Sequence, residues 1–366
     1  MSTMKAAIFV EPNRIELTDK KIPDVGVNDA LLKITTTTIC GTDIHILKGE
    51  YPVAKGLTVG HEPVGVIEKL GSNVSGYTEG QRVIAGAICP SFTSYSCQDG
   101  YPSQDGSYIH DEKCGCHKHG YKATAGWRFG NLIDGTQAEY VLVPDAQANL
   151  APIPDGLTDE QVLMCPDIMS TGFVGAENAN IKIGDIVAVF AQGPIGLCAT
   201  AGARLRGAST IIAIDGNDER LKISEKLGAN VTLNFTKVDV IDEIMKLTGG
   251  RGVDASIEAL GLQATFEQAM RILKPGGTLS SLGVYSKDLT IPLEAFAAGL
   301  GDHKINTALC PGGKERLRRL MSVLETGRVD LKPLVTHEYK LDDIVEAYDL
   351  FANQRDGVLK IAIKPF

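Results

Sequence analysis

Apolar and polar residues follow two different patterns along the chain, and the change between them divides it in two. Up to about residue 165, short β-branched runs are separated by turns rich in glycine. Such runs are typical of short strands, so this part is predicted to be a largely β domain. The expected strands lie at 5–9, 29–37, 63–70, 82–85 and 138–143.

From about Asp167 onward, apolar strand-like runs alternate with helical segments. This alternation predicts a parallel, doubly wound sheet with right-handed crossovers. An amphipathic helix at 314–325 and a last strand at 358–363 indicate that the chain returns to the first domain. We therefore expect an α/β protein with a β-rich domain at 1–168 and 309–366 and a doubly wound domain at 169–308. The expected strands of the second domain lie at 186–191, 210–215, 231–235, 253–259 and 277–282, with helices near 196–206, 218–227, 239–247 and 264–273.

Composition narrows the functional class. A chain of 366 residues is long enough for two cores, and its net charge of −9 argues against a general nucleic-acid or anionic-membrane binder. The N-terminal Met-Ser-Thr-Met-Lys lacks the apolar core of a secretory signal, and no uninterrupted apolar stretch approaches about twenty residues. Eight cysteines then indicate thiols or metal ligands rather than a disulfide framework. We expect a soluble, cytoplasmic protein.

A glycine turn joins the first strand of the second domain to its first helix. It contains Gly193, Pro194, Ile195 and Gly196, and Asp215 ends the next strand, nineteen residues after Gly196. Strand, glycine turn, helix, strand and acid form the dinucleotide-binding fingerprint, although Ala191 stands at its first glycine position. The Asp215 carboxylate can bind an adenosine ribose diol and would repel a 2′-phosphate, which favours NAD over NADP. A chance glycine turn in an α/β protein is the alternative.

Three separated positions carry side chains that bind metals. Cys40, His61 (followed by Glu62) and Asp167 would give zinc a thiolate, an imidazole and a carboxylate, leaving a fourth position open for catalysis. Their spacing does not show that they converge. Each also has a structural alternative: a small buried cysteine, a hydrogen-bonded turn histidine and a helix-capping aspartate.

Several motifs occur here in one familiar order, and together they span nearly the whole chain. The sequence resembles the zinc-dependent medium-chain alcohol dehydrogenases, most closely the bacterial secondary alcohol dehydrogenases. This resemblance implies a GroES-like β-rich catalytic domain, a Rossmann cofactor domain and reversible oxidation of alcohols. The motifs are Cys40-Gly-Thr-Asp-Ile-His45, Gly60-His-Glu62, Gly80-Gln-Arg-Val83, Ala125-Gly-Trp-Arg-Phe129, Asp167-Ile-Met-Ser-Thr-Gly-Phe173, Gly250-Arg-Gly-Val-Asp254 and Leu309-Cys-Pro-Gly-Gly313.

The resemblance also implies roles for individual residues near the metal. Zinc is expected on Cys40, His61 and Asp167, with Glu62 close enough to exchange with the substrate oxygen. Asp43 is expected to orient the zinc-bound histidine. Thr42 and His45 are expected to pass the alcohol proton to solvent, although His45 could be an ordinary surface histidine. Cys165 could compete with Asp167, but the Ser-Thr-Gly motif that follows favours Asp167.

For the cofactor, the resemblance implies contacts near the ends of the later strands. Relatives that use NADP carry Gly-Ser-Arg after the second strand, where this chain has Asp215-Gly-Asn217, so we expect NAD. Arg220 could stack on adenine or simply be solvated, and Lys360 could reach the pyrophosphate or be an ordinary strand lysine. The remaining expected contacts, to the nicotinamide half, are Ala259, Gly261, Gly283 and Val284.

The substrate pocket and a second metal are the remaining expectations. Trp127, Leu309 and Cys310 are expected to line an apolar pocket, although a lone tryptophan could equally be a core anchor. Many relatives hold a structural zinc with Cys-x2-Cys-x2-Cys-x7-Cys, a spacing that this chain lacks, so free thiols are expected instead. The residues in question are Cys89, Cys97, Cys114 and Cys116, flanked by His110, His117 and His119.

The sequence therefore predicts a zinc- and NAD-dependent dehydrogenase of secondary or primary alcohols. Within the same superfamily, the alternatives are a polyol, threonine or formaldehyde dehydrogenase. From another class, the alternative is a nucleotide-binding, quinone-reductase-like or regulatory protein without metal. The resemblance also suggests a homo-tetramer, with a dimer as the alternative.

Overall fold

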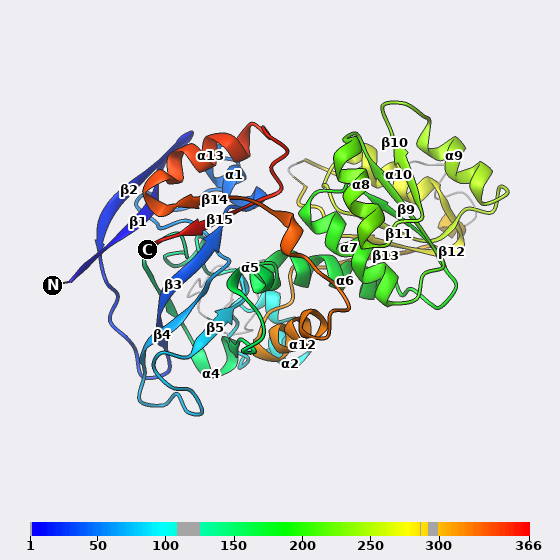
Figure 1. Ribbon diagram of the computed structural model, residues 1–366. Helices are drawn as coiled ribbons and strands as arrows, with labels where there is room; N and C mark the ends of the chain where they lie inside the picture. The colour runs from blue at the N-terminus through cyan, green and yellow to red at the C-terminus, as the bar shows by residue number, and fades with distance from the viewer. Residues whose placement is uncertain (1, 108–124, 286, 292–298) are drawn as a thin grey trace. The chain divides into compact units, whose positions relative to one another are not determined.

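The computed structural model describes residues 2–107, 125–285, 287–291 and 299–366. It separates into two compact units (Figure 1). The first, called the β-rich unit below, combines Met1–Ser170 with Cys310–Phe366, and the second, the doubly wound unit, is Thr171–Leu309.

A seven-stranded sheet forms the centre of the β-rich unit, with the strand order β14-β15-β3-β4-β5-β7 and with β6 paired to β3. The last strand, β15, pairs antiparallel with β3 and parallel with β14, so the C-terminal segment completes this sheet. The strands are β3 (Ala30–Thr38), β4 (Val64–Leu70), β5 (Arg82–Ala85), β6 (Tyr140–Val143), β7 (Leu150–Pro152), β14 (Val335–Lys340) and β15 (Lys360–Lys364), beside a separate ladder of β1 (Thr3–Glu11) and β2 (Arg14–Lys21).

Alternate residues of the central strand β3 build the core of this unit. Ala30, Leu32 and Ile34 point to one face and pack with Phe129 and Val141, the period-two pattern of a strand. The helices of the unit are α1 (Gly41–Leu47), α2 (Tyr95–Gln98), α4 (Ala146–Asn149), α5 (Asp159–Val162), α12 (Lys314–Glu325) and α13 (Ile344–Ala352), with short 3₁₀ turns at Pro102–Gln104, Lys332–Leu334 and Leu341–Asp343 and a π-helical turn at Cys165–Met169.

The doubly wound unit has a six-stranded sheet in which every pairing is parallel. Its order, β10-β9-β8-β11-β12-β13, corresponds to 3-2-1-4-5-6 when the strands are counted within the unit, the order of a dinucleotide-binding fold. The order in which successive strands are added to the sheet reverses between β8 and β11, and such sheets bind ligands at this point. The strands are β8 (Ile186–Phe190), β9 (Thr210–Asp215), β10 (Val231–Asn234), β11 (Val253–Glu258), β12 (Leu273–Ser281) and β13 (Lys304–Thr307).

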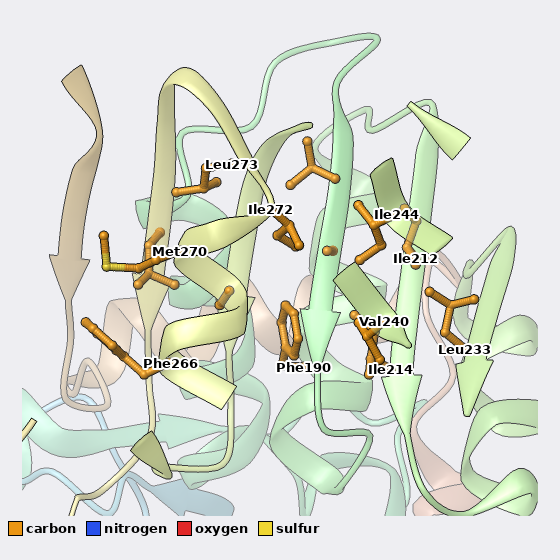
Figure 2. Packing of buried hydrophobic residues seen from close by; sticks show 14 residues of the cluster. Phe190, Ile212, Ile214, Leu233, Val240, Ile244, Phe266, Met270, Ile272 and Leu273 are labelled. Atoms are coloured by element: carbon orange, nitrogen blue, oxygen red, sulfur yellow. The ribbon is translucent and has the colours of Figure 1, made fainter. Parts of the chain in front are cut away.

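Helices cover both faces of this sheet because its strands are apolar on both sides. Figure 2 shows Phe190 and Ile214 beneath Ile244 of α9 and Phe266 of α10. On the other face, Val187 and its neighbours pack against α6 and α7. The helices are α6 (Ser170–Asn178), α7 (Pro194–Leu205), α8 (Asp218–Leu227), α9 (Val240–Leu247) and α10 (Gln263–Arg271), with a 3₁₀ turn at Gly299–Asp302.

The fold class expected from the sequence is confirmed, and most strand and helix ends fall within a few residues of their expected positions. Strands β2, β7, β13 and β14, the short helices α1, α2, α4 and α5, and helix α13 were not expected. Strand β2 is largely polar and mostly not buried, so it lacks an apolar run. Within the described part of the chain, no helix has the length and apolar character needed to cross a membrane.

The packing in Figure 2 predicts a sharp contrast between two positions of helix α9. Ile244 is fully buried, whereas Leu247 is 52% exposed. Ile244→Ala should lower the free energy of unfolding by about 2–5 kcal/mol, because it leaves a cavity under the helix. Leu247→Ala, the matched control, should change it by less than about 0.5 kcal/mol. Urea unfolding followed by circular dichroism measures both, and equal effects would contradict the packing described here.

Candidate metal centre and cofactor turn

Four side chains of ligand type meet inside the β-rich unit. One ligand atom from each of Cys40, His61, Glu62 and Asp167 lies within 4.8 Å of all the others. Asp167 Oδ2 lies 3.6 Å from Cys40 Sγ and 3.4 Å from His61 Nε2. A tetrahedral ion with bonds of ~2.0–2.3 Å holds its ligand atoms roughly 3.3–3.8 Å apart. The three atoms are therefore spaced as ligands of a single ion.

Local backbone structure places each of these side chains. Cys40 directly precedes helix α1, and its backbone N–H donates to the Asp43 carboxylate at 2.8 Å, which fixes the start of the helix. Asp167 lies in the π-helical turn, a distortion often found at functional sites. His61 follows Gly60, whose φ of +90° favours glycine and where a Cβ would lie 2.5 Å from the Gln137 side chain.

A chain of buried polar groups supports His61 from behind. Asp43 Oδ1 lies 3.4 Å from His61 Nδ1, so the aspartate can orient the ring and leave Nε2 facing the cluster. Gln137 donates to Asp43 Oδ2 at 3.3 Å, and Tyr348 OH donates to Gln137 at 2.8 Å. Sequence reasoning missed Gln137 and Tyr348, because neither lies near the metal-binding motifs and only the fold brings them there.

The electrostatics of the cluster favour a bound cation. Burial alone would lower the pKa of His61, but Asp43 and Asp167 raise it well above its ordinary value. Burial raises the pKa of the Cys40 thiol and of the Glu62 carboxyl. In the described part of the chain, Glu62 Oε1 is buried without a hydrogen-bond partner, whereas Asp43 Oδ1 and His61 Nδ1 face each other at 3.4 Å behind the cluster. A metal ion would supply the positive charge and keep the thiolate ionised, so the donor set fits zinc.

Lys360 is fully buried beside the cluster. Its ammonium donates to Glu62 Oε2 at 2.5 Å and to the carbonyl of Ile39 at 3.2 Å. Burial alone would lower the pKa of Lys360, but the Glu62 carboxylate raises it above the ordinary value. The structure thus assigns the lysine an ion pair that the sequence did not suggest, whereas its expected contact with a pyrophosphate remains a proposal.

The residues expected to relay the proton and to line the substrate pocket differ in exposure. Thr42 and His45 are partly exposed on α1, and His45 Nδ1 pairs with Glu50. The Trp127 ring centroid lies 6.0 Å from that of His61 and 5.1 Å from that of Tyr51, which sequence reasoning also missed. The indole is therefore next to the metal cluster.

The cysteines outside the cluster differ in position. Cys310 is buried, with its sulfur 3.7 Å from the Asp167 carbonyl, and Leu309 is the last residue of the doubly wound unit. Cys165 lies beside Asp167 in sequence, but its thiol donates to Met169 and it is not part of the metal cluster. Cys89 and Cys97 are buried free thiols. The expectation about Cys114, Cys116, His110, His117 and His119 falls outside the described residues.

In the doubly wound unit, the glycine turn follows β8 and caps α7. Gly193 precedes the helix, Pro194 and Ile195 open it, and no atom lies within 4 Å of a Cβ placed on Gly193. Space remains there for a phosphate at the helix N-terminus. A Cβ on Gly196 would lie 1.8 Å from the Ala191 carbonyl oxygen, which explains the need for glycine. Ala191 itself has the left-handed φ of +68° that glycine usually adopts.

Asp215 is buried to 9% exposure at the end of β9, facing this turn. Its carboxylate accepts hydrogen bonds from the backbone N–H of Gln192 at 2.6 Å and of Asn217 at 2.8 Å. These bonds fix the acid at the position from which a ribose diol is recognised. Arg220 is partly exposed on α8 nearby.

The other expected cofactor residues follow β11 and β12. Ala259 comes directly after β11, and Gly283 and Val284 come shortly after β12. All of them lie beyond the carboxyl ends of parallel strands, of which β11 borders the reversal point and β12 is its neighbour. Ligands of doubly wound sheets bind at this edge.

A dinucleotide fold and a buried cluster of a thiol, an imidazole and a carboxylate define a metal-dependent oxidoreductase. Comparison with known proteins gives the same result. Residues 26–155 match the alcohol dehydrogenase GroES-like domain, and residues 194–326 match the zinc-binding dehydrogenase domain. The chain therefore belongs to the zinc-dependent medium-chain alcohol dehydrogenases, and it is an alcohol oxidoreductase.

Individual relatives align with this chain over almost its full length. The chain is 83% identical over 363 residues to an alcohol dehydrogenase of Cupriavidus necator, covering 99% of both chains. It is 34% identical to the NADP-dependent isopropanol dehydrogenase of Thermoanaerobacter brockii, covering 98% of both. Among solved structures, the alcohol dehydrogenase TADH from Thermus sp. ATN1 is similar with a TM-score of 0.85 and 29% identity, covering 99% of both.

The buried ion pair between Lys360 and Glu62 leads to a prediction for stability. In protein stripped of metal by a chelator, Lys360→Met should lower the free energy of unfolding by about 3–5 kcal/mol, because Glu62 is left as a buried unpaired charge. Adding Glu62→Gln should restore much of the loss. Lys222→Met, which removes an exposed pair with Glu219, should change little. Urea titrations test this, and a double variant no more stable than the single one would contradict it.

Proposed function

We propose that this protein is a zinc- and NAD-dependent dehydrogenase that interconverts secondary or primary alcohols with ketones or aldehydes. The observation that carries the proposal is the convergence of Cys40, His61 and Asp167, from three distant parts of the chain, on one buried point. A metal-free nucleotide-binding protein would have no physical need for this cluster, and we therefore disfavour that alternative.

In the proposed mechanism, Cys40, His61 and Asp167 hold a single zinc ion, and Asp43 keeps the His61 ring in orientation. Held by these residues, zinc would supply Lewis acidity toward the substrate oxygen, and a nicotinamide cofactor would supply the hydride acceptor and donor. Lys360 holds Glu62 at the edge of the cluster, within reach of the same ion.

The alcohol proton needs a route out of a buried site. Thr42 carries a hydroxyl that can accept one proton while donating another, and it lies on the same helix as His45. His45 is 44% exposed and can exchange its proton with water. We propose that these two residues pass the proton from the substrate to solvent.

We propose an apolar substrate pocket around Trp127, with Cys310 and Leu309 contributing to it. Trp127 stands against His61 and Tyr51, which gives the metal site an aromatic wall. An uncharged alcohol or ketone of moderate size suits such a wall. The relative from Thermoanaerobacter brockii, which is named for isopropanol, acts on a substrate of this kind.

The choice of NAD depends on Asp215. Because relatives include NADP-dependent enzymes, the family does not decide the cofactor. Two backbone amides hold the Asp215 carboxylate in place, and a 2′-phosphate would bring a like charge against it. Gly193, Gly196, Arg220, Ala259, Gly283 and Val284 are proposed to contact the rest of the cofactor.

The oligomeric state and the cellular location of the protein are also proposals. We propose a cytoplasmic homo-tetramer, as the family resemblance suggests. Size-exclusion chromatography with light scattering distinguishes a tetramer from a dimer.

The metal proposal predicts graded losses of zinc affinity. His61→Ala and Asp167→Ala each remove a ligand and should weaken zinc binding by more than about 100-fold, whereas Asp43→Asn, which only disturbs orientation, should cost about 10–100-fold. Cys198→Ala, a buried cysteine in helix α7, is the matched control and should retain zinc. Competition with a fluorescent chelator measures the affinities. Undiminished binding in both ligand variants would rule out the proposed centre.

The cofactor proposal predicts a change of selectivity at one position. Asp215→Ala removes the charge opposed to a 2′-phosphate, so the ratio of kcat/KM for NADP to that for NAD should rise by about 100-fold or more. Asp218→Ala removes the same charge from an exposed position three residues along and should leave the ratio unchanged. Steady-state kinetics with both cofactors provide the test, and a constant ratio in the Asp215 variant would count against NAD recognition by this residue.

A further inference from the structure

A fully buried carboxylate lies at the end of strand β11, outside the residues so far given a role. Glu258 has 0% exposure, and burying an ionised carboxylate is costly unless other groups offset the charge. In the described part of the chain, the hydrogen-bond partners of Glu258 are all neutral donors.

The Glu258 carboxylate binds three separate segments. Its Oε1 accepts from the backbone N–H of Leu260 and of Gly261, both at 2.9 Å, and from the Thr265 hydroxyl at 2.7 Å. Its Oε2 accepts from the Tyr285 hydroxyl at 2.7 Å. One side chain thus joins the loop after β11, the start of α10 and the loop after β12.

Those two loops also touch each other through their glycines. A Cβ on Gly283 would lie 2.2 Å from the Gly261 nitrogen and 2.5 Å from Glu258 Oε2. A Cβ on Gly261, whose φ is +91°, would lie 2.5 Å from the Val284 carbonyl oxygen. The loops are therefore packed backbone against backbone, and Glu258 lies at the contact.

The position of these loops on the sheet indicates which part of the cofactor they serve. A dinucleotide-binding sheet consists of two mononucleotide-binding halves on either side of the reversal point. The half with β8 and β9 carries the phosphate turn and Asp215, which recognises the adenosine ribose. The half with β11 and β12 is then left for the second nucleotide, the nicotinamide end.

We propose that Glu258 is a positioning residue for the nicotinamide end of the cofactor. By accepting from the Leu260 and Gly261 amides and from Tyr285, it holds the two loops together in the shape that receives the second nucleotide. This inference rests on the proposed NAD-dependent function. Tyr285 is anchored in turn by Ser281 at 2.8 Å and by an edge-on contact with Phe266 at 6.0 Å.

The test compares a full cofactor with a fragment that lacks nicotinamide. Glu258→Leu removes every acceptor from the network, so it should weaken NADH binding by about 10–100-fold. ADP-ribose keeps the adenosine half and the second ribose and lacks only the nicotinamide ring, so its affinity should change by less than about threefold. Glu258→Gln keeps an oxygen for the two amides and should weaken NADH less than Glu258→Leu does. NADH fluorescence titration and calorimetry with ADP-ribose give the dissociation constants.

A matched control lies at the other end of the same strand. Asp254 is also a carboxylate with a side chain of low exposure (7%), and it accepts from the Ile186 N–H at 2.8 Å and pairs with Arg251 and Lys274. Asp254→Asn should lower the urea midpoint but leave both dissociation constants within about threefold of the wild type. A carboxylate that merely stabilised the strand would behave in this way.

The outcomes separate the two proposals. If wild-type protein binds neither NADH nor NADPH, the proposed function is wrong, and the role of Glu258 with it. If the wild type binds NADH, the role of Glu258 alone is overturned by any of three results: Glu258→Leu binds NADH normally, it loses ADP-ribose to the same degree, or Glu258→Gln is equally weak. Should Glu258→Leu fail to fold, Tyr285→Phe decides: an NADH-specific loss of about threefold or more supports the role, and unchanged affinity refutes it.

Discussion

The metal cluster of the β-rich unit depends on a positive charge among groups that are largely buried. Cys40, Glu62 and Asp167 bring groups that become anionic into the interior, where an unpaired charge is expensive. Lys360 offsets part of this negative charge, and so does His61, whose pKa is raised by two carboxylates. A divalent ion would offset the remaining negative charge. The same groups that would destabilise an empty interior thus create selectivity for a cation.

The surrounding fold keeps this arrangement in place through contacts that are far apart in sequence. Asp43 reaches Gln137, and Gln137 reaches Tyr348 on a helix near the C-terminus. Lys360 comes from the last strand, which pairs with β3 just before Cys40. The C-terminal segment therefore does more than complete a sheet. It supplies the buried ammonium of Lys360 and the Tyr348 hydroxyl behind the metal ligands.

Sequence patterns predicted those features that local chemistry determines. Asp215 could be placed because a buried strand leads directly to it, and helix Lys314–Glu325 because its apolar spacing is regular. The ligand set followed from motifs, although only the fold shows that Cys40 and Asp167 converge. Gln137, Tyr348 and the partner of Lys360 could not be foreseen, because their roles arise from side-chain contacts between segments that are far apart in the sequence. Polar strands such as β13 were missed because they carry no apolar run.

The backbone at Ala191 shows what a sequence fingerprint really encodes. This residue adopts a left-handed conformation that costs a side-chain-bearing residue about 1–2 kcal/mol, although the pattern would place glycine there. Its carbonyl nevertheless meets Gly196 in the tight approach that the turn requires. The turn thus keeps this torsion angle in this chain without a glycine at the position. Searches that demand three glycines would overlook such turns, whereas searches for the dihedral geometry would recover them.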